Sequence, residues 1–279
     1  MLKILKAGLF TTVQDTGRYG YLNKGVPVAG FMDTVSAHKV NQLLGNELGA
    51  ALLEITMTGP SLEFEQPCYI CFGGAEMEVS LNNKKINGFT VHKVRAGDIL
   101  AYGKLIKGFR SYLAIRNGFK TMKILGSRSL YAPVTPKSHL DEKDTVPYKA
   151  SEGFTPKITE LRVNSFLEEP LLETSRGPEF GVLTAKQRKD IFSREFTVSN
   201  QNDRMAYQLQ ERIEGHKASI LTSATLPGTV QLTPSGRIII LMKDGQTTGG
   251  YPRILQLSDQ AISILAQKKF GDTISFNPI

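Results

Sequence analysis

The sequence has few of the residues that metal centres and disulfide frameworks require: its 279 residues include 2 cysteines and 4 histidines. Cys68 and Cys71 form a lone C-x-x-C inside CYICF, where residues three apart on a strand point to opposite faces. We therefore expect two buried structural thiols rather than a disulfide or a shared metal. The histidines are dispersed and form no H-x-x-x-H pair, so no metal site is predicted.

Long apolar runs and clustered basic residues are also missing. Lys3 and Lys6 interrupt the first ten residues, which therefore lack an apolar core of signal-peptide length, and no later run approaches transmembrane length. We expect a cytoplasmic protein without membrane contact. The formal net charge of +8 suggests anionic partners, but the basic residues are scattered, which argues against a nucleic-acid interface. No recognised nucleotide-binding motif is present.

Strand signals dominate the chain. Short runs such as CYICF, RIIILM and TISF are rich in β-branched and aromatic residues and are bounded by Gly, Pro, Asn or Asp, which predicts a mainly β fold of barrels or sandwiches. Helical periodicity is confined to short stretches. Four helices are expected, each with a polar N-cap: Asp33 (ending at Gly45), Thr184 (through Phe192), Asp203 (through Ile213) and Ser258 (through Ala266).

Two related domains are predicted. The stretch 132–156 carries four prolines and many charges without a steady period, and is the best linker candidate. LLEITMTGPSLEF (52–64) and ILTSATLPGTVQL (220–232) share an order of apolar, polar and Gly-Pro or Pro-Gly elements, although chance similarity between β-rich segments would also explain this. We expect an N-terminal β domain over residues 1–140 and a C-terminal β domain over 141–279.

Polar clusters interrupt the strand pattern at several points. TTVQDTGRYGY surrounds two glycines with Gln14, Asp15 and Arg18, and GSRS presents Arg128 between two hydroxyls, as an anion nest or an exposed turn. Asp33 follows GVPVAGFM and is either a base or an N-cap. SNQNDRM repeats that arrangement, with Asp203 beside Arg204.

The segment QTTGGYP, residues 246–252, follows the strand RIIILM and is too long and too rich in donors for a simple turn. Gly249 and Gly250 would let the backbone approach a ligand, while Gln246, Thr247 and Thr248 offer amide and hydroxyl groups. A wide hairpin loop is the alternative.

In chain order, TTVQDTGRYGY, GVPVAGFMD, ALLEITMTGPSLEF, GSRS, SNQNDRMAYQL and QTTGGYPRI resemble the successive signatures of the family formed by the C subunit of 5-oxoprolinase. The same family is described as biotin-dependent carboxyltransferase-like, allophanate hydrolase subunit 2 and urea amidolyase related. This resemblance implies two cyclophilin-like β-barrel domains with a few short helices.

The activity implied by the resemblance is ATP-dependent opening of 5-oxoproline to glutamate, with homologues of the B and A subunits of 5-oxoprolinase as partners and with ATP bound by the assembled complex. Phosphoryl transfer to the lactam oxygen needs positive groups around the phosphate, for which Arg18, Arg128 and Arg204 are candidates, and a carboxylate for the ring proton. The expected catalytic residues are Asp33, Asp203 and Arg204. The expected substrate- or phosphate-binding residues are Gln14, Asp15, Arg18, Arg128, Gln246, Thr247, Thr248, Gly249, Gly250 and Tyr251.

The sequence departs from the family pattern near these residues. The segment after GSRS contains no glycine, Ala206 and Gln208 stand where Gly and Arg are usual, and Gly245 stands where Arg is common. Each change removes flexibility or positive charge. Three functions therefore stay open: a 5-oxoprolinase component, a carboxyltransferase module that accepts carboxybiotin from a separate carrier, and a non-catalytic regulatory partner of a B-subunit homologue.

Overall fold

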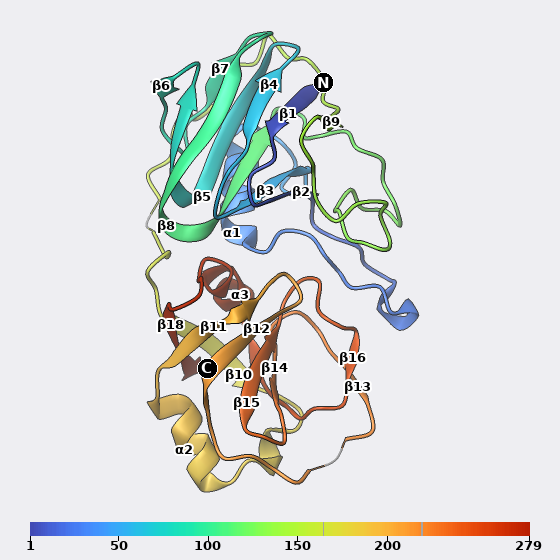
Figure 1. Ribbon diagram of the computed structural model, residues 1–279, viewed down its shortest axis with the longest axis vertical. Helices are drawn as coiled ribbons and strands as arrows, with labels where there is room; N and C mark the ends of the chain where they lie inside the picture. Colours follow the sequence, from blue (N-terminus) through green and yellow to red (C-terminus); the bar gives the residue numbers. More distant parts are fainter. Residues whose placement is uncertain (164, 219) are drawn as a thin grey trace. The chain divides into compact units, whose positions relative to one another are not determined.

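A computed structural model of the chain describes residues 1–163, 165–218 and 220–279 (Figure 1). It contains two compact units: Met1–Arg18 with Ala29–Glu168, and Tyr19–Val28 with Glu169–Ile279. Both are built mainly from strands, and the predicted fold class is confirmed: two barrel-like β units with a few short helices. The division after Glu168 differs from the predicted division after residue 140, because residues 141–168 belong to the first unit.

The first unit is a nine-stranded sheet that curls around its own core (Figure 1). Its main path has the order β2-β3-β8-β4-β1-β9, and β5 pairs with β6, β7 and β8. The strands are β1 Leu2–Lys6, β2 Phe10–Gln14, β3 Leu52–Thr56, β4 Ser61–Phe64, β5 Cys68–Leu81, β6 Lys84–Lys85, β7 His92–Val94, β8 Ile99–Ile115 and β9 Thr145–Val146.

The long strand β8 organises this sheet. β5 pairs along one of its edges, while the other edge is shared by β3 near Leu113 and by β4 near Leu100. Cys68 and Cys71, both on β5, are free and buried in two different hydrophobic clusters. The prediction of buried structural thiols on opposite strand faces is confirmed.

Helix α1, Thr34–Leu43, packs against β5 and β8 and begins as predicted at Asp33. The Asp33 carboxylate accepts a hydrogen bond from the backbone N–H of Ser36, which is the N-cap interaction. Ala37, Val40 and Leu44 are buried in one hydrophobic cluster. Local cap chemistry and apolar spacing therefore suffice to place this helix.

The second unit is a closed seven-stranded barrel in the order β10-β17-β14-β15-β12-β11-β18, with a separate two-stranded ribbon β13-β16. Its strands are β10 Leu171–Arg176, β11 Phe196–Asn202, β12 Ala206–Arg212, β13 Ser223–Ala224, β14 Thr229–Leu232, β15 Arg237–Leu241, β16 Thr248–Gly249, β17 Arg253–Leu257 and β18 Thr273–Pro278. Its helices are α2 Ala185–Ser193 and α3 Asp259–Leu265, with the short 3-10 turns η1 Leu22–Lys24 and η2 Phe180–Val182.

The predictions of α2 and α3 are confirmed, but the helix expected from Asp203 to Ile213 is wrong. Thr184 caps α2 through a capping box with Gln187, and Ser258 caps α3. Asp203 instead occupies the tight turn between β11 and β12, where its carboxylate accepts hydrogen bonds from the N–H groups of Met205 and Ala206. The same local side-chain chemistry serves an Asx turn and a helix N-cap, so the sequence signal was ambiguous.

The stretch 132–156 is not a linker between the units. Within it, β9 pairs with β1, and Leu140, Val146 and Tyr148 are buried in the core of the first unit.

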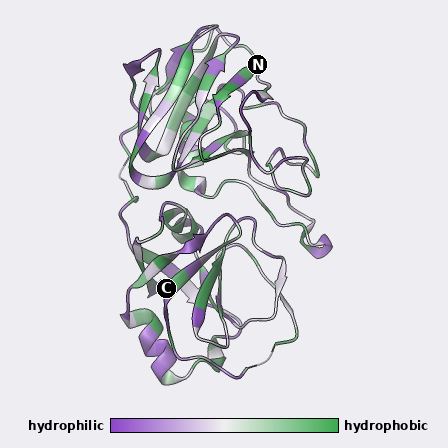
Figure 2. Cartoon of the chain, in the orientation of Figure 1, coloured by the Kyte–Doolittle hydropathy of each residue, from purple (hydrophilic) through white to green (hydrophobic). Residues whose placement is uncertain are grey.

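Hydrophobic residues concentrate on the strands in Figure 2, whereas α2 carries several hydrophilic residues. Among the residues that the structure describes, no helix is long and apolar enough to cross a membrane.

Candidate functional site

Asp15 holds the GSRS loop of the first unit in a fixed conformation. Its Oδ1 accepts hydrogen bonds from the hydroxyls of Ser127 at 2.5 Å and Ser129 at 2.8 Å and from the N–H of Gly17, and its Oδ2 accepts from the N–H of Arg128 at 2.7 Å. Asp15 is only 7% exposed. Its carboxylate is therefore occupied by the protein, and its first role is to position the loop.

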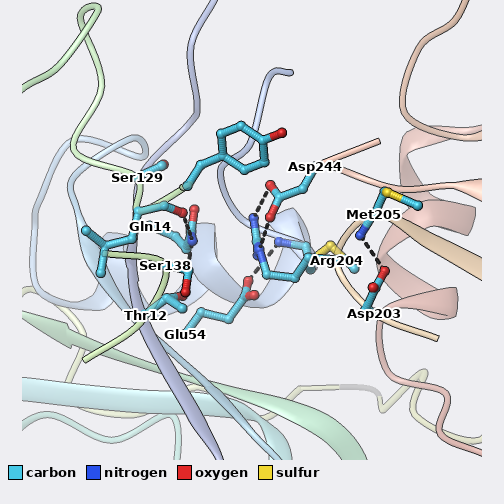
Figure 3. Close-up of polar contacts among 12 residues, drawn as sticks. Thr12, Gln14, Glu54, Ser129, Ser138, Asp203, Arg204, Met205 and Asp244 are labelled. Atoms are coloured by element: carbon cyan, nitrogen blue, oxygen red, sulfur yellow. Dashed lines mark hydrogen bonds and ion pairs between the residues drawn. The ribbon is translucent and has the colours of Figure 1, made fainter. Parts of the chain in front are cut away.

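Gln14 and Arg18 are buried as well, and both contact the segment that follows Arg128. The Gln14 amide donates to Thr12 and to the carbonyl of Leu130 and accepts from the N–H of Gly30, as part of the network in Figure 3. Arg18 donates through Nη2 to the carbonyl of Ser129. The fold brings these residues beside the GSRS loop, and each of them makes contacts that support the loop itself.

Arg128 lies differently from its neighbours. Ser127 and Ser129 are buried, whereas the Arg128 side chain is half-buried and lines a pocket of about 610 Å³ within the first unit. Its backbone is fixed by Asp15, while none of the hydrogen bonds or ion pairs of the described residues involves its guanidinium. Of the three arginines predicted to bind phosphate, Arg128 is therefore the one whose guanidinium is available to an anionic ligand.

A buried polar cluster around Asp33 escaped the sequence analysis. Glu54 accepts a hydrogen bond from the N–H of Met32 and lies 3.8 Å from the Arg110 guanidinium, and the Tyr112 hydroxyl accepts from the N–H of Asp33. All of them are buried. Burial, followed by the negative charges of Glu54 and Asp33, raises the pKa of Tyr112 well above its usual value. Charged residues inside the apolar runs LLEIT and FRSYLAI were the signal that could have revealed this cluster.

In the second unit, Arg204 anchors the segment before QTTGGYP. Its guanidinium donates to Asp244 in bidentate fashion, from Nε at 2.8 Å and from Nη2 at 3.0 Å, and Figure 3 shows the pair. The N–H of Asp244 also bonds to the carbonyl of Arg204. Both side chains are largely buried, so the pair fixes where the loop begins. Asp203, one residue earlier, caps its turn.

The QTTGGYP segment is part of a ribbon rather than a hairpin loop of its own. Thr248 and Gly249 form β16, which pairs with Ser223 and Ala224 of β13. Thr225 strengthens the ribbon, since its N–H bonds to the carbonyl of Thr247 and its hydroxyl to the carbonyl of Gln246. Gln246, Thr248, Gly250 and Tyr251 are exposed, and Thr247 and Gly249 are half-buried. The donors predicted for ligand binding are thus accessible.

Gly249 is the position in this ribbon where an added side chain would displace two glutamine amides. A Cβ atom there would lie 2.6 Å from Nε2 of Gln231 and 2.7 Å from Nε2 of Gln246. Gln231, on β14, is buried, and its Nε2 has no hydrogen-bond partner among the described residues. At Gly250 a Cβ would be 3.4 Å from its nearest neighbour, which is an ordinary contact. Gln231 was not identified from the sequence, because a polar residue inside TVQL reads as normal strand alternation.

The substitutions that depart from the family pattern lie close to these groups. Gln208 accepts a hydrogen bond from Arg237 at 2.7 Å, so a cation is retained beside this position although the residue itself is neutral. At Gly245 a Cβ would lie 2.9 Å from the carbonyl oxygen of Met242, which makes this turn tight for any larger residue.

Comparison with known proteins identifies the family. The model of the carboxyltransferase domain, subdomain A and B, matches residues 24–278, and the chain belongs to this family. It is 32% identical to the C subunit of 5-oxoprolinase from Escherichia coli over 99% of this chain and 90% of that protein, and 31% identical to the same subunit from Haemophilus influenzae over 100% and 91%. These matches confirm the family indicated by the sequence motifs.

Solved structures extend the similarity to larger enzymes. The crystal structure of the Kluyveromyces lactis urea carboxylase matches with a TM-score of 0.89 and 26% identity, over 100% of this chain and 27% of that one. The chain therefore corresponds to about a quarter of that larger protein. The alignment with that structure spans this chain and therefore includes all the candidate residues above.

Proposed function

We propose that this chain is one component of an ATP-dependent 5-oxoprolinase that opens 5-oxoproline to glutamate together with homologues of the B and A subunits in the cytosol. The observation that carries the proposal is similarity over nearly the full length to two proteins named as the C subunit of 5-oxoprolinase. The similarity covers 90% and 91% of the lengths of these two relatives.

The reaction proceeds in two steps under this proposal. The γ-phosphoryl group of ATP is transferred to the lactam carbonyl oxygen and ADP leaves. Two waters then complete the hydrolysis: the first adds at the activated carbon as the ring C–N bond breaks and the nitrogen takes up a proton, which gives an acyl phosphate, and the second releases inorganic phosphate and leaves the carboxylate of glutamate. A lactam carbonyl is a weak electrophile, so the phosphorylated oxygen makes the addition of water feasible. Cations and amide donors around that oxygen stabilise the developing charge.

Specific residues of this chain fit parts of that reaction. The exposed side chains of Gln246 and Thr248 and the half-buried hydroxyl of Thr247 can bind the oxygens of 5-oxoproline, and Tyr251 and Gly250 border them. Arg128 has an available guanidinium for phosphate. Asp33, Asp203 and Arg204 stay predictions as catalytic groups, because each also has a structural contact: the α1 N-cap, the β11–β12 turn and the Asp244 ion pair.

A biotin-dependent carboxyltransferase module is the second candidate. The family model carries the carboxyltransferase description, and the chain is 28% identical to a Lachancea kluyveri urea amidolyase, of which it covers 17%. In that case biotin would arrive on a separate carrier protein.

Reconstitution distinguishes these functions. The chain is co-purified with homologues of the B and A subunits from the same genome, and glutamate and ADP are measured with 5-oxoproline and ATP. We expect turnover by the complete complex and none by this chain alone, which has no phosphate loop. Equal turnover by the two partner homologues without this chain would refute a catalytic contribution and favour a regulatory role. ATP-independent transfer of a carboxyl group from carboxybiotin would favour the second candidate.

A further inference from the structure

The pocket beside Arg128 has an excess of positive charge. It lies wholly within the first unit, and its walls come from residues 45–51, 116–123 and 126–128 together with Asp15 and Thr16. Four of its side chains are cationic: Arg116, Lys120, Lys123 and Arg128. Glu47 and Asp15 are the acidic residues of the lining. The volume of about 610 Å³ falls in the range of small-molecule sites, about 300 to 1,000 Å³.

The negative charge of Asp15 does not neutralise these cations through a side-chain ion pair. Both carboxylate oxygens accept hydrogen bonds from the loop that carries Arg128, namely from two serine hydroxyls and from backbone N–H groups. The salt bridges of the described residues include none to Lys120, Lys123 or Arg128. Three of the four cations therefore face the pocket without an acidic partner among those residues.

Arg116 has a different function in the same wall. Its guanidinium donates to the carbonyls of Leu44 and Gly45 and stacks over the ring of Phe154, 4.6 Å from the centroid. These contacts fix the loop that contributes Glu47. The positive charge of Arg116 is thus held at the rim, and the Lys120 ammonium donates to the carbonyl of Asn117.

The crowding of the cations is unfavourable without a ligand. Burial and then the charge of Arg128 lower the pKa of Lys120, with smaller contributions of the same sign from Lys123 and Lys149, and Glu47 opposes them. Like charges held together destabilise one another, and a bound anion removes that repulsion. A strongly charged ligand therefore gains more from this pocket than a neutral one.

We propose that this pocket binds a phosphate group carried by a small molecule, either a nucleotide or another phosphorylated metabolite. Guanidinium and ammonium groups around a polar cavity match the several oxygens of a phosphate, and the backbone of Arg128 is held by Asp15. This site includes the Arg128 guanidinium that the proposed function assigns to phosphate, and to that extent it rests on that function; its cavity, charge and loop geometry all lie within one unit.

Calorimetric titration of the purified full-length chain tests the site. The probes are ATP, pyrophosphate and inorganic phosphate, with glutamate as a carboxylate probe, in about 0.15 M salt so that long-range attraction is screened. The pocket variant is Lys120→Gln/Arg128→Gln. The control is Lys6→Gln/Lys84→Gln, which removes the same charge from two exposed residues outside the pocket.

We expect at least one phosphate probe to bind with a Kd below about 1 mM, at least about tenfold weaker binding in the pocket variant, and unchanged binding in the control. Tighter binding of ATP than of pyrophosphate would show that the ligand is a nucleotide. Equal affinity for the two would show that the pocket recognises the phosphate group alone. The proposal is overturned if no phosphate probe binds, if both variants weaken binding equally, or if glutamate binds as tightly as the phosphates.

A thermal melt of each variant provides a second readout. Pyrophosphate should raise the Tm of the parent chain and of the control but not that of the pocket variant, since only ligand bound to the folded state stabilises it. Because all of these measurements use the chain without partners, a lack of 5-oxoprolinase turnover in the reconstituted complex would leave the result unaffected.

Discussion

At the scale of single residues, substitution of Gly249 tests most directly whether the QTTGGYP ribbon binds a ligand. Gly249→Ala places a methyl group within 2.6 Å of Gln231 Nε2 and 2.7 Å of Gln246 Nε2, so both amides must shift. We expect kcat/KM of the reconstituted complex to fall by about tenfold or more, equivalent to about 1.4 kcal/mol, with a Tm change of a few degrees at most.

Gly250→Ala is the matched control, since its Cβ would meet its nearest neighbour at an ordinary 3.4 Å. It should leave the Tm close to the parent value and lower kcat/KM less than Gly249→Ala does. Parallel losses of rate and stability in the two variants would contradict a ligand-binding role for the ribbon. Thr248→Val removes one exposed hydroxyl and should lower kcat/KM without changing the Tm if that hydroxyl binds substrate.

Substitution by asparagine and by alanine distinguishes a structural from a catalytic role for Asp33 and for Asp203. Each accepts backbone N–H hydrogen bonds through Oδ1, an interaction that asparagine retains and alanine removes. We expect each alanine variant to lose about 1 to 2 kcal/mol in the free energy of unfolding, measured by urea titration, and each asparagine variant to lose less. An asparagine variant that is stable but inactive in the complex would assign that residue to acid–base chemistry.

At the scale of secondary-structure elements, β5 buries two thiols that should make stability depend on pH. Burial raises the pKa of Cys68 to about 12 and also raises that of Cys71, whereas an unfolded thiol ionises with a pKa of about 8.5. The folded state therefore holds protons that the unfolded state releases above that value. Stability is fully present below about pH 8.5 and declines as the pH rises toward 12.

Between about pH 8 and 9.5 we expect a loss of roughly 1 kcal/mol per thiol in the free energy of unfolding, followed by urea titration. The Cys68→Ala/Cys71→Ala variant should be less stable throughout but should show a flatter pH dependence in this range. If the free energy of unfolding depends on pH with the same slope in parent and variant, groups other than these two thiols cause the dependence. Native thiols should also resist alkylation at pH 8 until the chain is unfolded.

The elements that were predictable from the sequence are those defined by local chemistry. Thr184, Ser258 and Asp33 mark helix starts because the cap hydrogen bond involves residues only three apart. The full length of the strands β5 and β8 is not apparent from the sequence, because glycines at 73, 74, 103 and 108 interrupt the β-branched pattern, while the pairing of the two strands resumes on the far side of these interruptions. That pairing is non-local and leaves no local signal.

Contacts within the candidate site were only partly predictable from the sequence. Its motifs identified loops that the fold does bring together, such as Gln14, Asp15 and Ser129. The basic pocket escaped detection although Arg116, Lys120, Lys123 and Arg128 lie within 13 residues of one another, because its opposite wall comes from residues 45–51, which meet them only in the folded chain. Gln231 escaped because its absence of a hydrogen-bond partner among the described residues is a property of three-dimensional packing.

At the scale of the whole molecule, the division of the chain is discontinuous. Tyr19–Val28 belongs to the second unit although the residues on both sides of it belong to the first. Local composition does not indicate to which unit a segment belongs. The stretch 132–156 has the composition of a domain boundary, because its prolines and charges interrupt the strand pattern. Its core residues Leu140, Val146 and Tyr148 attach it to the first unit instead.

Limited proteolysis with a glutamate-specific protease tests this division. In the stretch 132–168, Glu142 lies in a turn braced by Lys137 with Asp141 and Asp144, the carbonyl of Glu152 accepts a bond from Tyr69, and Glu160 pairs with Thr90. The backbone of Glu168 makes no hydrogen bond among the described residues, and its side chain is 78% exposed. Because cleavage requires local opening, we expect the first cut within this stretch to follow Glu168.

Mass spectrometry should therefore find fragments 1–168 and 169–279 before any product of cleavage after Glu142 or Glu152. Glu168→Gln removes the cleavage site without removing a strong contact, since the ion pair of Glu168 with Lys107 is exposed. That variant should lose the early fragments at unchanged Tm. Early cleavage after Glu142 would instead show that residues 132–156 open independently, as a linker would, and would contradict the assignment of residues 141–168 to the first unit.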